Sequence, residues 1–166
     1  MPNWCANHLV VKHDDTAMVK KLVEGFNNDG LFSAFFAKPE DVTDWHTWNV
    51  GNWGTKWDVT YRDGSDVRIL SPNYVIFNFA TAWSPPIAFY EGLKGLGFEV
   101  DAMYFEPGMC FCGEWADGFE THIHIDEPTH SWVVANVPPL LDEVFDISGH
   151  YAEYEDEIEE QTYAHI

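Results

Sequence analysis

Two short segments, Cys110-Phe111-Cys112 and His122-Ile123-His124, carry the side chains of a common zinc ligand set on neighbouring expected strands. The two-residue turn Asp117-Gly118 lies between them, and it sets Ala116 opposite Phe119 and Cys112 opposite Ile123. The cysteines and the histidines then point to opposite faces of the hairpin. We therefore expect structural cysteines that face inward together with Phe119, and neither a metal site nor a cofactor.

Cys5 is a second candidate for chemistry, as a nucleophile with His8 as its base. Positions 5 and 8 of one strand point to opposite faces, so the two side chains do not meet. The surrounding sequence also lacks the Gly-flanked turn, helix N-terminus or acidic group that activates a thiol. We expect a packed cysteine, and an enzyme ranks third among the functions considered. Three cysteines form no even disulfide framework and suit a reducing cytoplasm.

Tryptophans are concentrated in residues 41–57, among glycine and asparagine. The segment follows neither a helical nor a strand period, so we predict an ordered loop that is pinned by its tryptophans. Two interpretations of the indoles stay open. They are either the loop's own hydrophobic anchors or, together with Trp4 and Trp83, the lining of a pocket for a planar ligand such as a nucleotide. The residues of that alternative ligand site are Trp53, Lys56, Trp57 and Trp83.

The chain has a net charge of −20, with 8 basic and 28 acidic residues, and the charge is unevenly placed. Residues 1–94 contain every Lys and Arg, whereas residues 95–166 contain 17 acidic residues and no Lys or Arg. Such a surface repels phosphate, which argues against direct nucleic-acid binding. It favours a basic partner protein, because carboxylates on a rigid surface can stand in for DNA phosphates. General solubility or adaptation to high salt is the other interpretation.

The carboxylates assigned to partner binding lie in the C-terminal segment, residues 137–166. A short amphipathic helix is expected after Pro138-Pro139, followed by a second, acidic helix or a frayed tail. The predicted partner-binding residues are Asp142, Glu143, Asp146, Glu153, Glu155, Asp156, Glu157, Glu159 and Glu160.

The strongest strand signal is the apolar run from Tyr74 to Trp83, which has apolar residues on both faces and so belongs inside a sheet. Ser84 then offers a helix N-cap, with Pro85-Pro86 at the first helical positions. Asp14 or Asp15 caps an earlier amphipathic helix. The other expected strands are residues 4–13, a hairpin or edge strand within 58–70, residues 98–105 and the hairpin around residues 117–118.

The order strand, helix, strand, strand, helix, strand predicts an α+β fold with a ferredoxin-like antiparallel sheet and two helices on one face. The hairpin extends this sheet, and an acidic helical segment follows it. We predict a domain over residues 1–136, with the Trp-rich insertion 41–57, and an acidic helical extension over residues 137–166.

Three sequence blocks resemble the YubB-like ferredoxin-like proteins of plasmids and bacteriophages. The blocks are Pro2-Asn3-Trp4-Cys5 with Asn7, then Asn52-Trp53-Gly54-Thr55-Lys56-Trp57-Asp58, then Thr81-Ala82-Trp83-Ser84-Pro85-Pro86. The resemblance spans residues 2 to about 105. It implies a ferredoxin-like fold and an origin in a mobile element, and it supplies no catalytic residues.

Together these observations predict an accessory interaction protein of a phage or plasmid. Its acidic surface would bind a basic host protein, as a DNA mimic or an inhibitor of host defence. The alternative is a small-ligand or nucleotide-binding module that uses the Trp-rich loop. The sequence contains no apolar run of 18 residues and no signal peptide, so we expect a protein of the host cytoplasm without membrane contact.

Overall fold

The computed structural model describes residues 1–165 and has an α+β architecture, with a six-stranded antiparallel sheet and seven helices in that range. The order of the strands across the sheet is β2-β3-β1-β4-β5-β6. The interior strand predicted from the apolar run is β3, which pairs with β2 on one side and β1 on the other. The strands are β1 (Trp4–Lys12), β2 (Asp66–Ser71), β3 (Tyr74–Ala82), β4 (Glu99–Glu106), β5 (Phe111–Ala116) and β6 (Phe119–His124).

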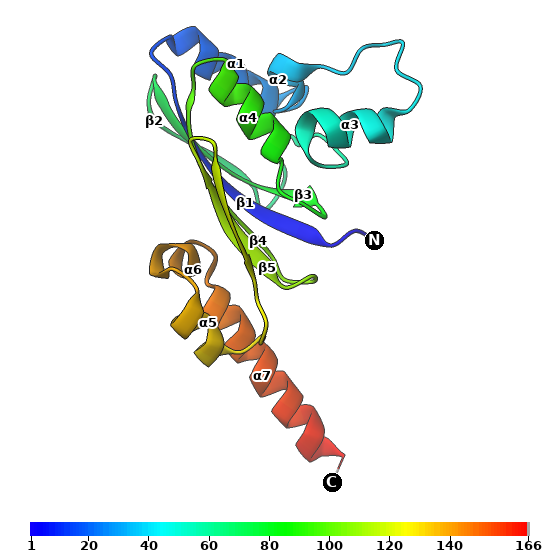
Figure 1. The fold of residues 1–166 in the computed structure, drawn as a ribbon, viewed down its shortest axis with the longest axis vertical. Coiled ribbons are helices and arrows are strands. Elements are labelled where there is room, and N and C mark those ends of the chain that lie inside the picture. Colours follow the sequence, from blue (N-terminus) through cyan, green and yellow to red (C-terminus); the bar gives the residue numbers. More distant parts are fainter. Residues whose placement is uncertain (166) are drawn as a thin grey trace.

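The helices lie on both faces of the sheet (Figure 1). Helices α1, α2 and α4 cover one face with α3 beside them, whereas α5, α6 and α7 pack at the other face over β4, β5 and β6. The helices are α1 (Thr16–Asn27), α2 (Ser33–Phe36), α3 (Trp45–Trp53), α4 (Ile87–Gly95), α5 (His130–Asn136), α6 (Pro139–Phe145) and α7 (Ile147–Ala164).

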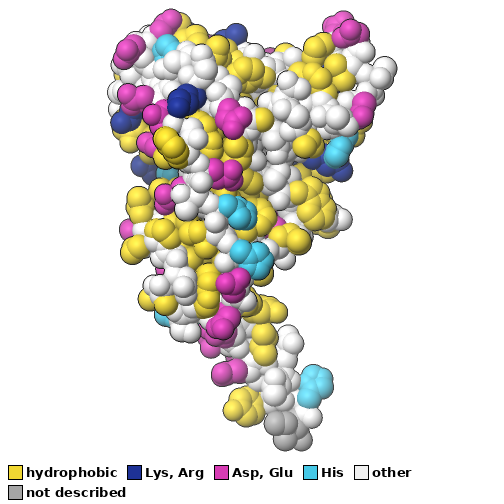
Figure 2. All heavy atoms as spheres, viewed as in Figure 1, with side chains coloured by type: hydrophobic (Ala, Val, Ile, Leu, Met, Phe, Trp, Pro, Cys, Tyr) yellow, Lys and Arg dark blue, Asp and Glu magenta, His cyan; other side chains and the backbone are white. Residues whose placement is uncertain are grey.

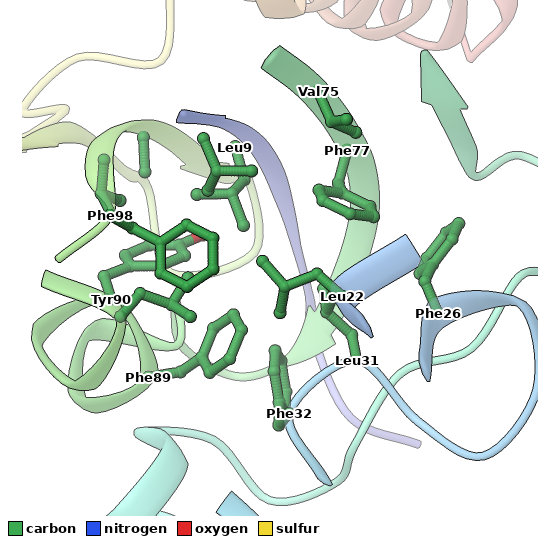
Figure 3. Close-up of a cluster of buried hydrophobic side chains, with 14 of the residues drawn as sticks. Leu9, Leu22, Phe26, Leu31, Phe32, Val75, Phe77, Phe89, Tyr90 and Phe98 are labelled. Atoms are coloured by element: carbon green, nitrogen blue, oxygen red, sulfur yellow. The ribbon is translucent and has the colours of Figure 1, made fainter. Parts of the chain in front are cut away.

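The larger core lies between the sheet and helices α1, α2 and α4. Alternate residues of the strands point into it, so that Leu9 of β1 pairs with Phe77 of β3 and with Ala102 of β4. Phe32 and Phe89 meet above this layer with their ring centroids 4.7 Å apart (Figure 3). All five side chains are at least 95% buried.

A smaller core lies on the opposite face, where the three C-terminal helices meet the sheet. Phe105 and Cys112 come from the strands, and Leu141, Ile147 and Tyr151 come from the helices. Because the two cores use opposite faces of the same strands, β4 and β5 are covered on both sides. This explains how a chain with so many apolar residues places them in one sheet.

The prediction of a loop over residues 41–57 is wrong, because α3 occupies Trp45–Trp53. The Asp44 carboxylate accepts a hydrogen bond from the Thr47 N–H at 3.1 Å, and hydrogen bonds from Thr47 lower the pKa of Asp44. Gly54 ends the helix with φ at 89°. Caps at both ends stabilise a helix whose apolar residues do not follow a helical period.

Two other local predictions are corrected. Ser84 is not the N-cap, since α4 begins at Ile87 and is preceded by Pro86. Phe119 does not face a core: its side chain is 80% exposed, because β6 is the edge strand and the second core reaches only as far as Ile123.

The C-terminal helical part begins earlier than residue 137. Helix α5 starts at His130, with Thr129 as its N-cap, and packs along α7. Asp15 caps α1 as expected. Residues 58–61 form no strand, so the strand that precedes β3 is β2 alone.

Candidate functional site

Three segments that are far apart in the sequence meet at one end of β1 and β3. We call residues 3–7, 53–58 and 81–86 the junction. The Trp83 N–H donates to the Asn3 carbonyl at 2.9 Å, and the Asn7 side-chain amide donates to the Thr81 hydroxyl at 2.8 Å. Ser84 donates to the Gly54 carbonyl at 2.7 Å. These bonds connect all three sequence blocks that carry the family resemblance.

The polar side chains inside the junction are almost fully buried. The Thr55 hydroxyl donates to the Ala82 carbonyl at 2.9 Å, and the Thr81 hydroxyl donates to the Ser84 carbonyl at 2.7 Å. Thr55, Thr81 and Asn7 are each no more than 2% exposed. A buried polar group without a partner costs about 1–3 kcal/mol, so these bonds hold the three segments in one arrangement.

Two backbone positions in the junction adopt positive φ. Gly54 has φ at 89°, and a Cβ atom there would lie 2.8 Å from the Ile87 backbone nitrogen. Trp83 has φ at 71°, although it is a bulky residue that disfavours this region. Its indole is 48% exposed. Strain of this kind persists only where surrounding contacts enforce it, and it is concentrated at functional sites.

An open hollow of about 800 Å³ lies beside the junction. We call it the Trp hollow because Trp4 and Trp57 line it, with their ring centroids 6.4 Å apart. Both indoles are partly exposed, as residues that contact a ligand must be. The rest of the lining is Asp58, Val59, Thr60, Arg62, Asp63, Gly64, Ser65 and residues 79–82.

The four residues of the predicted ligand site do not converge on this hollow. Trp57 lines it, and the Lys56 ammonium lies 4.4 Å from the centre of the Trp57 ring. Trp53 instead belongs to the larger core, where its indole N–H donates to the Phe36 carbonyl at 2.9 Å. Trp83 is exposed outside the lining of the hollow. Trp4, one of the indoles expected to line a pocket, does line the hollow, and so does Arg62, which the sequence reasoning did not include.

The nine predicted partner-binding carboxylates divide into two groups. Six lie on α7, which extends away from the sheet beyond Tyr151 and ends at the far tip of the molecule (Figure 1). The other three, Asp142, Glu143 and Asp146, lie on α6 or at its end. Asp142 accepts a hydrogen bond from the Ser148 N–H at 2.7 Å, so it also fixes the start of α7.

A polar cluster on the sheet was not anticipated. The Tyr104 hydroxyl donates to Glu120 at 2.9 Å and lies 3.0 Å from His122 Nδ1. Burial, followed by the neighbouring Glu120, raises the pKa of Tyr104, so the phenol stays protonated. Two features of the sequence could have predicted this cluster. Glu120 and His122 alternate on β6 and so share one face, and Gly113, opposite His122, has no side chain and leaves room for the Tyr104 ring.

The cysteines are placed as the turn geometry predicts. Cys112 pairs with Ile123 and lies in the second core, whereas His122 points to the other face of the hairpin, and the predicted register is confirmed. Within residues 1–165 no three His, Cys, Asp or Glu side chains are arranged to bind a metal. Burial raises the pKa of the Cys112 thiol to about 11, and burial likewise raises the pKa of Cys5. Protonated thiols are poor nucleophiles.

Comparisons with protein families, with curated proteins and with solved structures find no match. The resemblance to YubB-like proteins therefore stays a prediction from the three sequence blocks. Over residues 1–165, none of the helices combines the length and the apolar character that a membrane span requires.

Proposed function

We propose that this protein is a non-catalytic interaction module that binds a basic partner protein through α7. The observation that carries the proposal is an exposed apolar stripe between carboxylates on a helix that extends beyond the rest of the protein (Figure 2). The three properties are the exposed apolar stripe, the flanking carboxylates and the projection of the helix, and a helix without a partner needs none of them. Together they describe a surface for a partner with both apolar and cationic groups.

The apolar stripe continues directly from the second core. Tyr151 is buried, and Tyr154 and Ile158 follow at helical spacing with 49% and 46% of their surfaces exposed. The same face of α7 is thus covered at its first turns and open farther along. An amphipathic helix that leaves its apolar residues open is the form in which many helices enter a groove on a partner.

The charges on α7 repel one another. Glu153 and Glu157 are four residues apart, as are Glu155 and Glu159 and also Asp156 and Glu160, and each pair destabilises a helix by about 0.2–0.5 kcal/mol. Among residues 1–165 none of the six carboxylates forms an ion pair with a Lys or Arg. Lys and Arg side chains on a partner would relieve this repulsion.

The distribution of charge over the surface supports the same conclusion. In Figure 2 the Lys and Arg side chains in view lie on the upper part of the molecule, whereas the lower, projecting part shows Asp and Glu. Such a surface attracts cations over a distance of about 8 Å at physiological salt. We therefore propose a partner that itself binds nucleic acid, with α7 occupying part of its basic groove.

We also propose the ferredoxin-like class and an origin in a phage or plasmid. The order β2-β3-β1-β4, with α1 and α4 over one face, supports the class. The alternative function, a planar ligand stacked on the Trp-rich segment, has less support, because only Trp57 of its four residues lines the Trp hollow.

A pull-down from bacterial lysate at low and high salt tests the main proposal. The full-length protein is compared with a variant that carries Glu153, Glu157, Glu159 and Glu160 changed to Lys. Glu155 is kept, because it accepts a hydrogen bond from the His130 N–H. We expect a basic protein that is retained at low salt, released at high salt, lost with the variant and displaced by duplex DNA.

The matched control reverses four exposed carboxylates elsewhere, with Asp29, Glu40, Asp41 and Glu91 changed to Lys. This control has the same net charge as the first variant and should retain the partner. Equal retention by all three proteins, or equal loss from both variants, contradicts a specific role of α7.

A further inference from the structure

The Trp hollow has the form of a slot between two stretches of backbone. One wall is the end of β3, residues 79–82, and the other is the segment 57–62. Strand β2 pairs with β3 only from Tyr74 to Asn78, where Asn78 lies opposite Asp66 at the start of β2. The last residues of β3 therefore have β1 on one side and the slot on the other.

Ala80 presents unpaired backbone groups to this slot. The Trp83 N–H donates to the carbonyl of Asn3, directly before β1. Backbone groups of successive strand residues point to opposite edges, so those of Ala80, three residues earlier, point away from β1. In the described chain no hydrogen bond to the N–H or C=O of Ala80 comes from the slot side. This is an open strand edge that lines the hollow, and such an edge can pair with an added strand.

The opposite wall also presents unpaired backbone groups to the slot, at Thr60. The Val59 carbonyl accepts from the Leu31 N–H at 2.8 Å, and the Tyr61 N–H donates to the Phe26 carbonyl at 2.8 Å. Both bonds point toward α1 and the loop that follows it. In a planar trans peptide the C=O and N–H point in opposite directions, so the N–H and C=O of the intervening Thr60 point the other way, into the slot. Thr60 has no backbone hydrogen bond to any residue from 1 to 165.

The side chains around the slot define what could enter. Trp4 and Trp57 supply apolar area. Arg62 supplies a guanidinium that has no ion pair within the described residues. Asp63 lies nearby, whereas the Asp58 carboxylate is occupied by hydrogen bonds from Phe32, Ser33 and Val59.

We infer that the slot binds an extended segment of a partner protein as an added β-strand between Ala80 and Thr60. The segment carries a large apolar side chain for the two indoles and a carboxylate for Arg62. Backbone hydrogen bonds supply affinity in this mode of recognition, and the side-chain contacts supply specificity. The site is separate from α7 and does not depend on the function proposed for that helix.

The probe is a phage-displayed library of random 12-residue peptides, selected on the full-length protein. Enriched sequences are expected to combine an aromatic or large aliphatic residue with Asp or Glu. Amide hydrogen exchange by NMR then locates the bound peptide. The amides of Ala80 and Thr60 should exchange at least tenfold more slowly with peptide, whereas those of Phe79 and Thr81, already directed at β1, should change little.

Two pairs of variants complete the test. Arg62→Gln should weaken the enriched peptide at least tenfold, whereas Arg68→Gln, an exposed arginine on β2 outside the slot, should stay within twofold. Trp57→Ala should weaken binding likewise, and Trp45→Ala, exposed on α3, should not. The inference is overturned if no peptide is enriched, if protection appears only at other amides, or if the members of each pair behave alike.

Discussion

The junction and the distal part of α7, residues 153–164, treat polar side chains in opposite ways: the junction buries them, and distal α7 exposes most of them. In the junction, polar side chains such as Thr55 and Thr81 are buried and find partners on segments distant in the sequence. On distal α7, Glu153 and Glu157 are exposed and have like-charged neighbours. The junction is therefore determined by internal contacts, whereas the carboxylates of distal α7 form no ion pair with a Lys or Arg of residues 1–165.

This difference indicates how each region should respond to mutation. A change in the junction breaks several contacts at once, because one hydrogen bond positions the next. A change on distal α7 should alter the surface electrostatics, and with them the partner binding that we propose, but little of the folded core. Variants in the junction should therefore lower the stability of the fold, whereas variants on distal α7 should mainly change partner binding.

Gly54→Ala should cost at least about 3 kcal/mol of folding free energy. The substitution forces a residue with a Cβ to φ of 89° and places that atom 2.8 Å from the Ile87 nitrogen. Gly51→Ala is the control, since it lies in α3 with no atom within 4 Å of the added Cβ, and it should stabilise the protein by about 0.5–1 kcal/mol. Urea unfolding measures both, and similar values would refute the role of Gly54.

Thr81→Val should cost about 2 kcal/mol, because the Asn7 amide then keeps only its bond to the Cys5 carbonyl and the Ser84 carbonyl loses the Thr81 hydroxyl. Thr121→Val on β6 is the matched control. Its side chain is exposed, and the change should stay within about 0.5 kcal/mol. If the two variants unfold at the same urea concentration, the buried network does not stabilise the junction.

Removal of residues 153–166 should change the folding free energy by less than about 1 kcal/mol, since residues 153–165 contribute nothing to either buried core. Partner retention in the pull-down should nevertheless be lost. Tyr151→Ala is the contrasting variant and should cost about 3 kcal/mol, because Tyr151 packs in the second core. A truncated protein that unfolds as readily as Tyr151→Ala would show that distal α7 is part of the fold.

Glu157→Lys should stabilise α7 by roughly 0.5 kcal/mol. It replaces the repulsion with Glu153 by an attraction in the favourable order, the acidic residue preceding the basic one by four positions. Circular dichroism at 222 nm should show a gain in helicity that decreases with added salt. Glu157→Gln, which only removes the charge, should give about half the gain, and no gain from either variant would contradict the repulsion argument.

Local signals in the sequence predicted most of the elements. The strand β3, the cap at Asp15 and the register of the hairpin around Asp117-Gly118 depend on neighbouring residues or on strict alternation, and the structure confirms them. Helix α3 was missed because its tryptophans follow no helical period. Its caps, Asp44 and Gly54, were readable signals that the aromatic composition obscured.

The candidate sites were predicted less completely. The exposed carboxylates of α7 could be identified because a helix of one charge has little reason to be buried. The Trp hollow could not, because its lining combines residue 4, residues 57–60 and 62–65, and residues 79–82. No spacing rule relates these positions. Trp53 and Trp57 are only four residues apart, yet one is buried in the core and the other is exposed at the hollow.

The sequence by itself determined the α+β composition, the hairpin register and the unequal division of charge, because each follows from residue type and local periodicity. Only the tertiary structure decided which segments meet. Pairing of β1 with β3 brought residue 3 to residue 83, and the Thr55 hydroxyl found the Ala82 carbonyl across the junction. Such long-range contacts depend on how the strands are ordered and on which buried polar groups satisfy one another, and neither is encoded in any single stretch of chain.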